Sequence, residues 1–128
     1  MEKVIITNNP LIKEKFASTY EVELYHKDYL GVLETVRDKI HLGHELLSHP
    51  LAGSIKPNET PYRTILLTKE GSSPFATSSA ESSEMILKAH TAFEKFTDKQ
   101  KITDADLLAD YQVVDLALAS SAVEAADR

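Results

Sequence analysis

The fold is decided near the amino end by the segment Lys3-Val4-Ile5-Ile6-Thr7-Asn8-Asn9-Pro10. Its apolar part is a β-branched run without polar alternation, which is typical of a strand buried on both faces. Asn9 before Pro10 indicates a helix start, because asparagine can cap free backbone N–H groups and proline suits the first helical position. A strand covered on both faces needs helices on each side of its sheet, so the segment predicts a three-layer α/β protein.

Two further strands are expected along the chain. Residues 20–25 alternate apolar and charged side chains, as a half-exposed edge strand does. The continuous apolar run Thr64-Ile65-Leu66-Leu67-Thr68 suits a central strand, and the glycine and proline in residues 71–74 terminate it.

Two helices are expected between these strands. The first runs from Pro10 through about residue 16. The second begins at an Asp28 cap and is expected to end near Ser48, because Pro50 restricts the residue before it to extended geometry. Its apolar stripe has helical spacing and comprises Leu33, Val36, Ile40 and Leu47.

Two more helices are expected at the carboxyl end, each introduced by a capping pattern. Ser78 precedes Glu81 by three positions, and Thr103 precedes Asp106 by three positions. The apolar stripes comprise Ile86, Ala89, Phe93 and Phe96 in one helix, and Leu107, Tyr111, Val114, Leu118, Ala122 and Ala125 in the other. The acidic residues of the last helix are expected to form a solvated face, or else a docking surface for a basic partner: Asp104, Asp106, Asp110 and Asp115.

This order of elements predicts a single α/β domain over residues 1–128. Its parallel or mixed sheet has three to four strands in the order 2-1-3, with helices on both faces and two of them at the carboxyl end. Ligands of such sheets usually bind beyond the carboxyl ends of the strands. That edge is expected to hold Asn8, Asn9, His26, Lys27, Lys69 and Ser72.

The long connection at residues 49–62 does not fit the simplest version of this topology. A loop of this length tends to be functional. If the third strand is parallel, however, the loop that precedes it lies at the edge opposite the carboxyl ends of the strands, away from the expected ligand site. Three alternatives follow. The loop wraps around the sheet, the third strand is antiparallel, or the loop is not part of a site at that edge.

Composition excludes several classes of function. The chain has no cysteine, which excludes disulfides, thiolate metal sites and a cysteine nucleophile. The whole formal charge of −6 falls in residues 70–128, so a nucleic-acid partner is not expected. No apolar run approaches the about 20 residues of a membrane span, and the amino terminus lacks a signal-peptide core, so we expect a cytoplasmic protein without a membrane partner.

Three of the five histidines fall in residues 37–63. His41 and His44 lie three positions apart on the expected helix, and with His49 from the loop they could bind a metal or act as a general base. Alternatively, His44 is a core histidine and His41 pairs with Asp38 or Glu45. No metal or cofactor is assigned.

The same segment carries cations and hydroxyls that could hold a small anion. Asn8 and Asn9, at the start of the first expected helix, could contribute to anion binding as well. The candidate ligand-binding residues are therefore Asn8, Asn9, Arg37, His41, His44, His49, Ser54, Lys56, Tyr62 and Arg63. Alternatively, Arg37 and Arg63 pair with local acids, and the asparagines serve only as caps. No glycine-rich nucleotide fingerprint and no G-x-S-x-G motif occurs, so nucleotide binding and serine hydrolysis have no support.

Three stretches, residues 6–10, 36–51 and 53–63, resemble the GrdX family in their order and spacing. They read Ile-Thr-Asn-Asn-Pro, then Val-Arg-Asp-Lys-Ile-His-Leu-Gly-His-Glu-Leu-Leu-Ser-His-Pro-Leu, then Gly-Ser-Ile-Lys-Pro-Asn-Glu-Thr-Pro-Tyr-Arg. The resemblance covers roughly residues 3–70. It implies a small protein encoded with the selenium-dependent glycine, sarcosine and betaine reductases of amino-acid-fermenting anaerobes, and it assigns no catalytic residues.

The favoured hypothesis is a non-catalytic accessory or regulatory protein of such a reductase system, which binds a small anion or a reductase-complex protein through residues 37–63. The first alternative is a small enzyme that uses His41, His44 or His49 as general base or metal ligand. The second is a structural interaction module, such as a homodimer.

Overall fold

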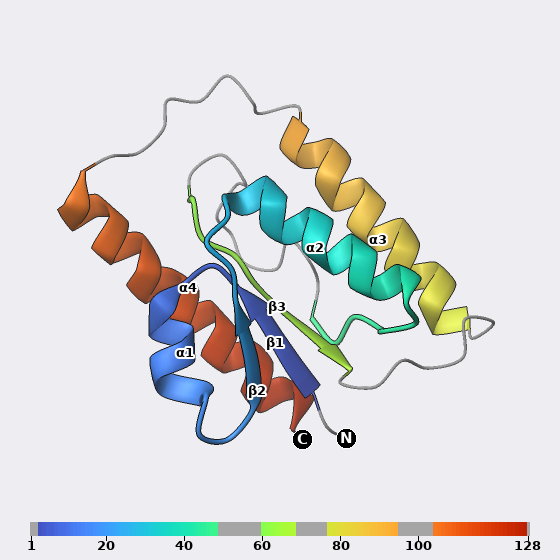
Figure 1. Cartoon of the computed structure of the whole chain (residues 1–128), viewed down its shortest axis with the longest axis horizontal. Helices are drawn as coiled ribbons and strands as arrows, with labels where there is room; N and C mark the ends of the chain where they lie inside the picture. Colours follow the sequence, from blue (N-terminus) through green and yellow to red (C-terminus); the bar gives the residue numbers. More distant parts are fainter. Residues whose placement is uncertain (1–2, 49–59, 69–76, 95–103, 128) are drawn as a thin grey trace.

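The computed structural model describes residues 3–48, 60–68, 77–94 and 104–127 (Figure 1). Three strands and four helices follow one another along the chain: β1 (Lys3–Thr7), α1 (Pro10–Phe16), β2 (Glu21–Leu24), α2 (Tyr29–His41), β3 (Thr64–Thr68), α3 (Thr77–Glu94) and α4 (Ala105–Ala126). This is the predicted α/β class with two helices at the carboxyl end.

The sheet is mixed and has the predicted order β2-β1-β3. β1 pairs in parallel with β2, with Val4 opposite Glu21, and antiparallel with β3, with Thr7 opposite Thr64. The second of the three alternatives for the third strand is therefore correct. Because β3 is antiparallel, the residues that lead into it lie at the end of the sheet where β1 finishes.

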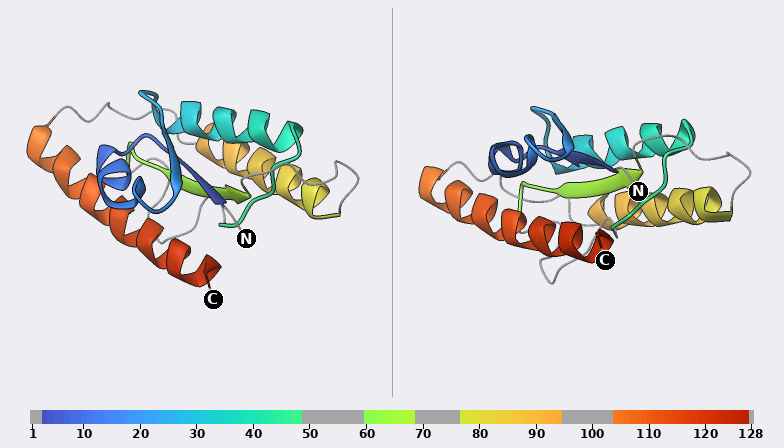
Figure 2. Two further views of the ribbon diagram at one scale, coloured as in Figure 1. Left: turned by 60° about the horizontal axis from the view of Figure 1, so that its bottom comes forward. Right: turned by 90° about the horizontal axis from the view of Figure 1, so that it is seen from below.

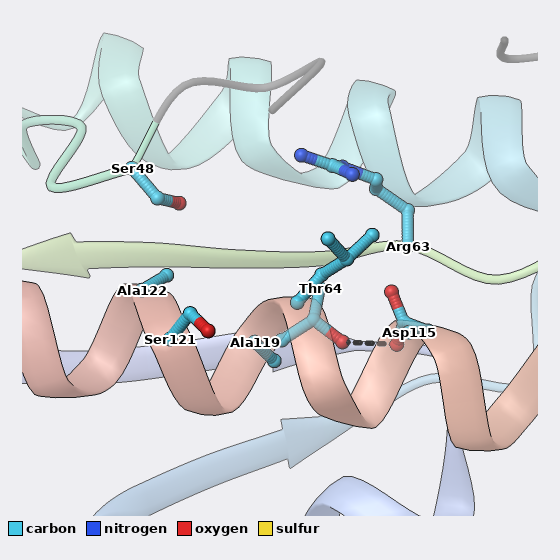
Figure 3. A pocket seen from close by; sticks show the side chains of 8 residues that line it. Ser48, Arg63, Thr64, Asp115, Ala119, Ser121 and Ala122 are labelled. Carbon is cyan, nitrogen blue, oxygen red and sulfur yellow. Dashed lines mark hydrogen bonds between the residues drawn. The ribbon is translucent and has the colours of Figure 1, made fainter. Parts of the chain in front are cut away.

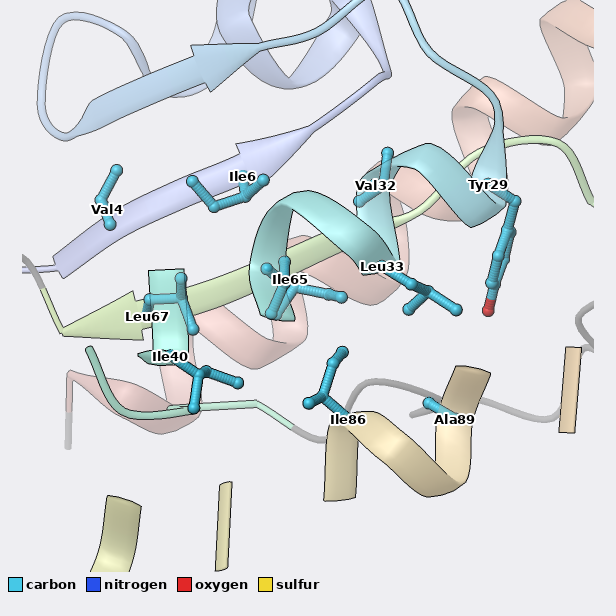
Figure 4. Close-up of a cluster of buried hydrophobic side chains, with 11 residues drawn as sticks. Val4, Ile6, Tyr29, Val32, Leu33, Ile40, Ile65, Leu67, Ile86 and Ala89 are labelled. Carbon is cyan, nitrogen blue, oxygen red and sulfur yellow. The ribbon is translucent and has the colours of Figure 1, made fainter. Parts of the chain in front are cut away.

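Helices cover both faces of the sheet, as the doubly buried β1 sequence predicts (Figures 1 and 2). On one face, alternate residues of β1 and β3 pack against α2 and α3, in a cluster that includes Val4, Ile6, Leu33, Ile65 and Ile86 (Figure 4). On the other face, Ile5 and Leu66 pack against α1 and α4 in a cluster that includes Ile12, Ala119 and Val123. The two clusters make the three layers.

Helix α2 begins at the predicted Asp28 cap, whose side chain accepts the Gly31 N–H, but its predicted end near Ser48 is wrong. The helix ends at His41, and Gly43 has a positive φ of 105°. The N–H of Gly43 bonds to the carbonyl of Ile40 at 2.9 Å, and the N–H of His44 bonds to the carbonyl of Lys39 at 3.2 Å. This pair of bonds is a Schellman motif, which satisfies the last carbonyls of the helix and turns the chain away.

After this turn, residues 44–48 run along the outer edge of β3 instead of continuing the helix. The N–H of Leu47 donates to the carbonyl of Leu66 at 2.8 Å, and the N–H of Leu46 donates to Ser82 Oγ of α3 at 3.0 Å. Leu46 packs against the α2–α3 face and Leu47 against the α1–α4 face. Leu47 matched the helical stripe only by spacing. In the fold it is part of an extended segment that covers the edge of β3.

The buried face of α4 also differs from the predicted stripe. Leu107 is 42% exposed and Val114 is 39% exposed, whereas the buried residues are Asp115, Ala119 and Val123. Apolar residues occur on several sides of α4, so hydrophobic periodicity does not select one face. The prediction that Asp115 is solvated is wrong, while Asp104, Asp106 and Asp110 are exposed as expected.

The caps of the two carboxyl-end helices differ slightly from the predicted ones. Asp104, not Thr103, caps α4, and it accepts the Leu107 N–H at 3.0 Å. Helix α3 already includes Thr77, so Ser78 is not its cap. The predicted buried positions Ile86 and Ala89 are confirmed, and Phe96 lies outside the described residues. In the described parts of the chain, no helix combines the length and apolar content that crossing a membrane requires.

Replacing Gly43 with alanine tests the helix end. An L-residue at a φ of 105° is strained, and we expect the free energy of unfolding to fall by about 1–2 kcal/mol in urea titrations. Leu42→Ala is the matched control, because Leu42 is an exposed neighbour with ordinary helical φ, and its effect should stay within about 0.5 kcal/mol. Equal stability of Gly43→Ala and the native protein would contradict the motif.

Candidate functional site

Four of the predicted site residues meet where β1 ends and β3 begins. Asn8 and Asn9 directly follow β1, and Tyr62 and Arg63 directly precede β3. The antiparallel register brings the two pairs to the same end of the sheet.

The side chain of Asn8 joins three chain segments at this end through hydrogen bonds. Its amide nitrogen donates to the carbonyl of Pro61 at 2.8 Å and to the carbonyl of Lys27 at 3.0 Å. Its amide oxygen accepts the N–H of Arg63 at 2.9 Å. The side chain of Asn8 therefore positions the residues that lead into β3.

Asn9 has two structural roles. Its side-chain oxygen accepts the Leu11 N–H at 3.1 Å, which is the predicted cap of α1. Its amide nitrogen donates to the carbonyl of Gln112 at 2.9 Å and to Asp115 Oδ2 at 3.0 Å, so it also connects α1 to α4. The side chain is completely buried and makes these bonds inside the protein.

A line of buried hydroxyls leads from Asn9 to the same carboxyl group. The N–H of Asn9 donates to Thr7 Oγ1 at 3.0 Å, and the Thr7 and Thr64 hydroxyl oxygens are 2.8 Å apart. Thr64 donates to Asp115 Oδ2 at 2.7 Å. Because a hydroxyl carries one proton, Thr7 is then the donor to Thr64, and every bond in the line points toward Asp115. Aligned donors of this kind stabilise a negative charge at the end of the line.

Asp115 is a buried acid with opposing influences on its ionisation. It is 4% exposed, and this burial raises the pKa of its carboxyl group above the ordinary 3.8. The hydrogen bonds from Asn9 and Thr64 and the nearby Arg63 charge act against burial and favour the ionised form. Asp115 is thus held by protein donors on one oxygen and lies near a cation.

Arg63 is a buried cation close enough to this carboxyl group to favour its ionised form. It is 6% exposed, and its charge also lowers the pKa of the buried Tyr29 hydroxyl, although burial raises that pKa overall. Next to it, Tyr62 accepts a hydrogen bond from the Gln112 side-chain amide at 2.8 Å. The hydrogen bond from Gln112 connects Tyr62 to α4, whereas Arg63 is a nearby charge for both Asp115 of α4 and Tyr29 of α2.

A pocket of about 280 Å³ opens beside these groups, between β3 and α4 (Figure 3). Figure 3 shows Arg63 extending from the start of β3 toward Ser48, and Asp115 rising from α4 beneath the strand. The lining residues are Ser48, Arg63, Thr64, Asp115, Leu118, Ala119, Ser121 and Ala122. The wall thus offers one guanidinium, one carboxyl group and several hydroxyls around a small volume.

Among the predicted site residues that the structure describes, Arg63 lines this pocket, whereas Asn8, Asn9 and Tyr62 lie beside lining residues without lining it themselves. The other predicted residues that the structure describes lie elsewhere. Arg37 pairs with Asp38 at 3.3 Å on the exposed side of α2, and His41 is exposed at the end of that helix. His44 Nδ1 lies 2.7 Å from the carbonyl of Thr68, at the opposite end of β3, and not on a helix as predicted. His49, Ser54, Lys56, Lys69 and Ser72 lie outside the described residues.

No three histidine and carboxylate side chains gather as a metal site among the residues whose positions the structure gives. His41 belongs to α2, whereas His44 follows the Schellman turn and faces β3. The prediction that these two histidines lie on one turn of the same helix is therefore wrong.

The sequence patterns missed Thr7, Thr64, Gln112 and Asp115. The threonines lie at the ends of strands, where their hydroxyls carry no special pattern. Asp115 could have been noticed because it lies four positions before Ala119 and eight before Val123, all on one helical face. A carboxylate in such a stripe indicates either a paired buried acid or a binding site.

Comparison with known proteins gives one match. The family model described as "GrdX-like protein" matches residues 4–124. No curated protein and no solved structure matches the chain. The family match extends well beyond the roughly 70 residues that carry the sequence resemblance, and it includes α4 with Asp115.

Asp115→Asn tests the burial of this acid through the pH dependence of stability. The folded protein binds the Asp115 proton more tightly than the unfolded chain does, because the pKa is raised on folding. The contribution of Asp115 to stability is then complete below pH 3.8, the ordinary pKa of an aspartate, and is lost as the pH rises through the pKa of the folded protein. We expect the free energy of unfolding of the variant, relative to the native protein, to increase over that window and to be constant on either side.

Asparagine is close to aspartate in shape, and its amide oxygen can still accept from Asn9 and Thr64, so the variant should fold. The exposed Asp110→Asn is the matched control on the same helix and should show no such increase. Urea titrations of the three proteins at several pH values provide the measurement. A difference that does not change with pH would mean that folding does not raise the pKa of Asp115.

Proposed function

Because the chain belongs to the GrdX-like protein family, we propose that it is a non-catalytic, cytoplasmic accessory protein of a glycine-reductase-type system and that it binds a small anion beside Arg63. The family match supports the context, and the pocket supports the binding. The observation that carries the proposal is an almost completely buried arginine in the wall of a pocket of about 280 Å³.

Arg63 is suited to an anion because its guanidinium has five N–H donors in a planar fork that matches carboxylate or phosphate oxygens. A neighbour that takes one or two of these donors leaves others for a ligand. Low exposure removes competing water and strengthens each charged hydrogen bond.

Hydroxyl groups add donors on two sides of the pocket. Ser48 Oγ accepts the N–H of Leu66 at 3.0 Å, and accepting this bond leaves its own proton to donate. Ser121 lies across the pocket on α4. Pockets for drug-sized molecules usually exceed about 300 Å³, so this volume favours a ligand of few atoms, such as a carboxylate or acyl phosphate.

The enzyme alternative receives less support from the described histidines. His41 is exposed at the end of α2, and His44 lies at the far end of β3 from Arg63. Neither ring is placed to take a proton from a ligand in this pocket, which is why the proposal is binding without turnover.

Titration calorimetry with acetate, phosphate and acetyl phosphate tests the anion site. We expect saturable binding that Arg63→Gln weakens by about tenfold or more and Arg63→Lys by less, since lysine keeps the charge but loses the fork. Ser121→Trp is a second variant, which fills the pocket from an exposed position without removing a buried group. Val113→Trp, on an exposed side of α4 away from the lining residues, is its control and should bind normally.

Binding that none of Arg63→Gln, Arg63→Lys or Ser121→Trp changes would overturn the site, as would the absence of saturable binding of every anion. Circular dichroism of each variant separates lost binding from lost folding.

The absence of turnover is tested with acetyl phosphate followed by ³¹P NMR. We expect its loss to proceed at the same rate with the protein as in buffer alone. Loss that is faster with the native protein and returns to the buffer rate with Ser121→Trp would show a reaction in this pocket and would replace the accessory role with an enzymatic one.

A further inference from the structure

The pocket wall carries both signs of charge. Arg63 and Asp115 are the charged residues among those that line it, and they reach it from different elements, the start of β3 and the middle of α4. A site that selected only anions would gain nothing from a carboxyl group in its wall, because like charges repel. The presence of Asp115 therefore needs a separate explanation.

The two oxygens of Asp115 are used differently. Both of its hydrogen bonds, from Asn9 at 3.0 Å and from Thr64 at 2.7 Å, end on Oδ2. Among the residues that the structure describes, none donates a hydrogen bond to Oδ1. Figure 3 shows the second oxygen directed toward the Arg63 side of the pocket, away from Thr64. A buried carboxylate is stable when each oxygen has donors, so Oδ1 is suited to a donor that comes with a ligand.

The protein donors also fix the position of this carboxyl group. Thr64 and Asn9 hold Oδ2 and are themselves buried, so the carboxyl plane is held before any ligand arrives. A preorganised acceptor of this kind orders little on binding and so loses little affinity. Ala119 and Ala122 supply the neighbouring wall with small side chains, which leaves space for a ligand next to Oδ1.

We infer that the ligand is a small zwitterionic α-amino acid whose carboxylate binds Arg63 and whose ammonium group donates to Asp115 Oδ1. The inference rests on the proposed anion site and specifies the class of molecule it takes. Ser48 provides a further donor for the carboxylate, and the small pocket volume favours an amino acid with little or no side chain. An ammonium ligand next to Asp115 also favours the ionised carboxylate, so ligand and protein charges stabilise each other.

The mode of binding predicts an order among N-methylated ligands. Each methyl group replaces one N–H donor while the positive charge and the carboxylate stay the same. Glycine has three N–H donors, N-methylglycine has two and N,N,N-trimethylglycine has none, so affinity for the native protein should fall in that order. This comparison needs no variant and does not depend on whether an altered protein folds.

Titration calorimetry with glycine, acetate and methylammonium tests the inference. We expect glycine to bind about tenfold or more tightly than acetate, because it adds a charge-assisted hydrogen bond to Asp115, and methylammonium to bind weakly without a carboxylate. Asp115→Asn should bring the affinity for glycine down to that for acetate and leave acetate binding unchanged or tighter. Asp110→Asn is the exposed control on α4 and should behave as the native protein.

The outcomes separate the two proposals. Binding of acetate together with no preference for glycine, or a glycine preference that survives in Asp115→Asn, would overturn the zwitterion inference and leave the anion site intact. Trimethylglycine that binds as tightly as glycine would overturn it as well. Failure of both acetate and glycine to bind would overturn the anion site and the inference together.

Discussion

The antiparallel pairing of β3 with β1 is the constraint on which the site depends. Thr7 lies opposite Thr64, so the chain that enters β3 must pass beside the chain that leaves β1. Asn8 stabilises this meeting through its bonds to Pro61 and Arg63. A parallel β3 would carry Arg63 to the other end of the sheet. The direction of one strand thus decides whether there is a pocket with a buried cation at all.

Helix α4 supplies the other wall of the pocket, and its buried face includes the charged residue Asp115. Asp115 bonds to Asn9 and Thr64 and so connects the last helix to both β1 and β3. Removing a buried carboxylate from water costs several kcal/mol unless donors replace the water, and three features of the fold reduce that cost: two hydrogen bonds and the nearby Arg63 charge. An apolar residue would pack there without this cost, which is a reason to connect Asp115 with binding and not only with stability.

Membership of the GrdX-like family and the geometry of the pocket address different levels of function. The family match concerns which proteins this chain is related to. The pocket indicates what the chain could bind, namely a molecule that fits a volume of about 280 Å³ and contacts a guanidinium and a carboxyl group at once. An accessory role requires only recognition, and the described wall is built from groups that hold charges in place.

The sequence alone determined the elements whose signals are local. The β-branched run of β1, the Asn9 and Asp28 caps and the alternation in β2 each depend on neighbours within a few residues. The order of these elements along the chain then predicted the 2-1-3 sheet with helices on both faces. The tertiary structure decided the direction of β3, the end of α2 and the buried face of α4. Leu47 has helical spacing but lies beyond Gly43, and Asp115 resembles a surface acid until Asn9 and Thr64 are placed beside it. Spacing along one element cannot reveal which distant segment packs against it, and burial, register and charge pairing are properties of that contact.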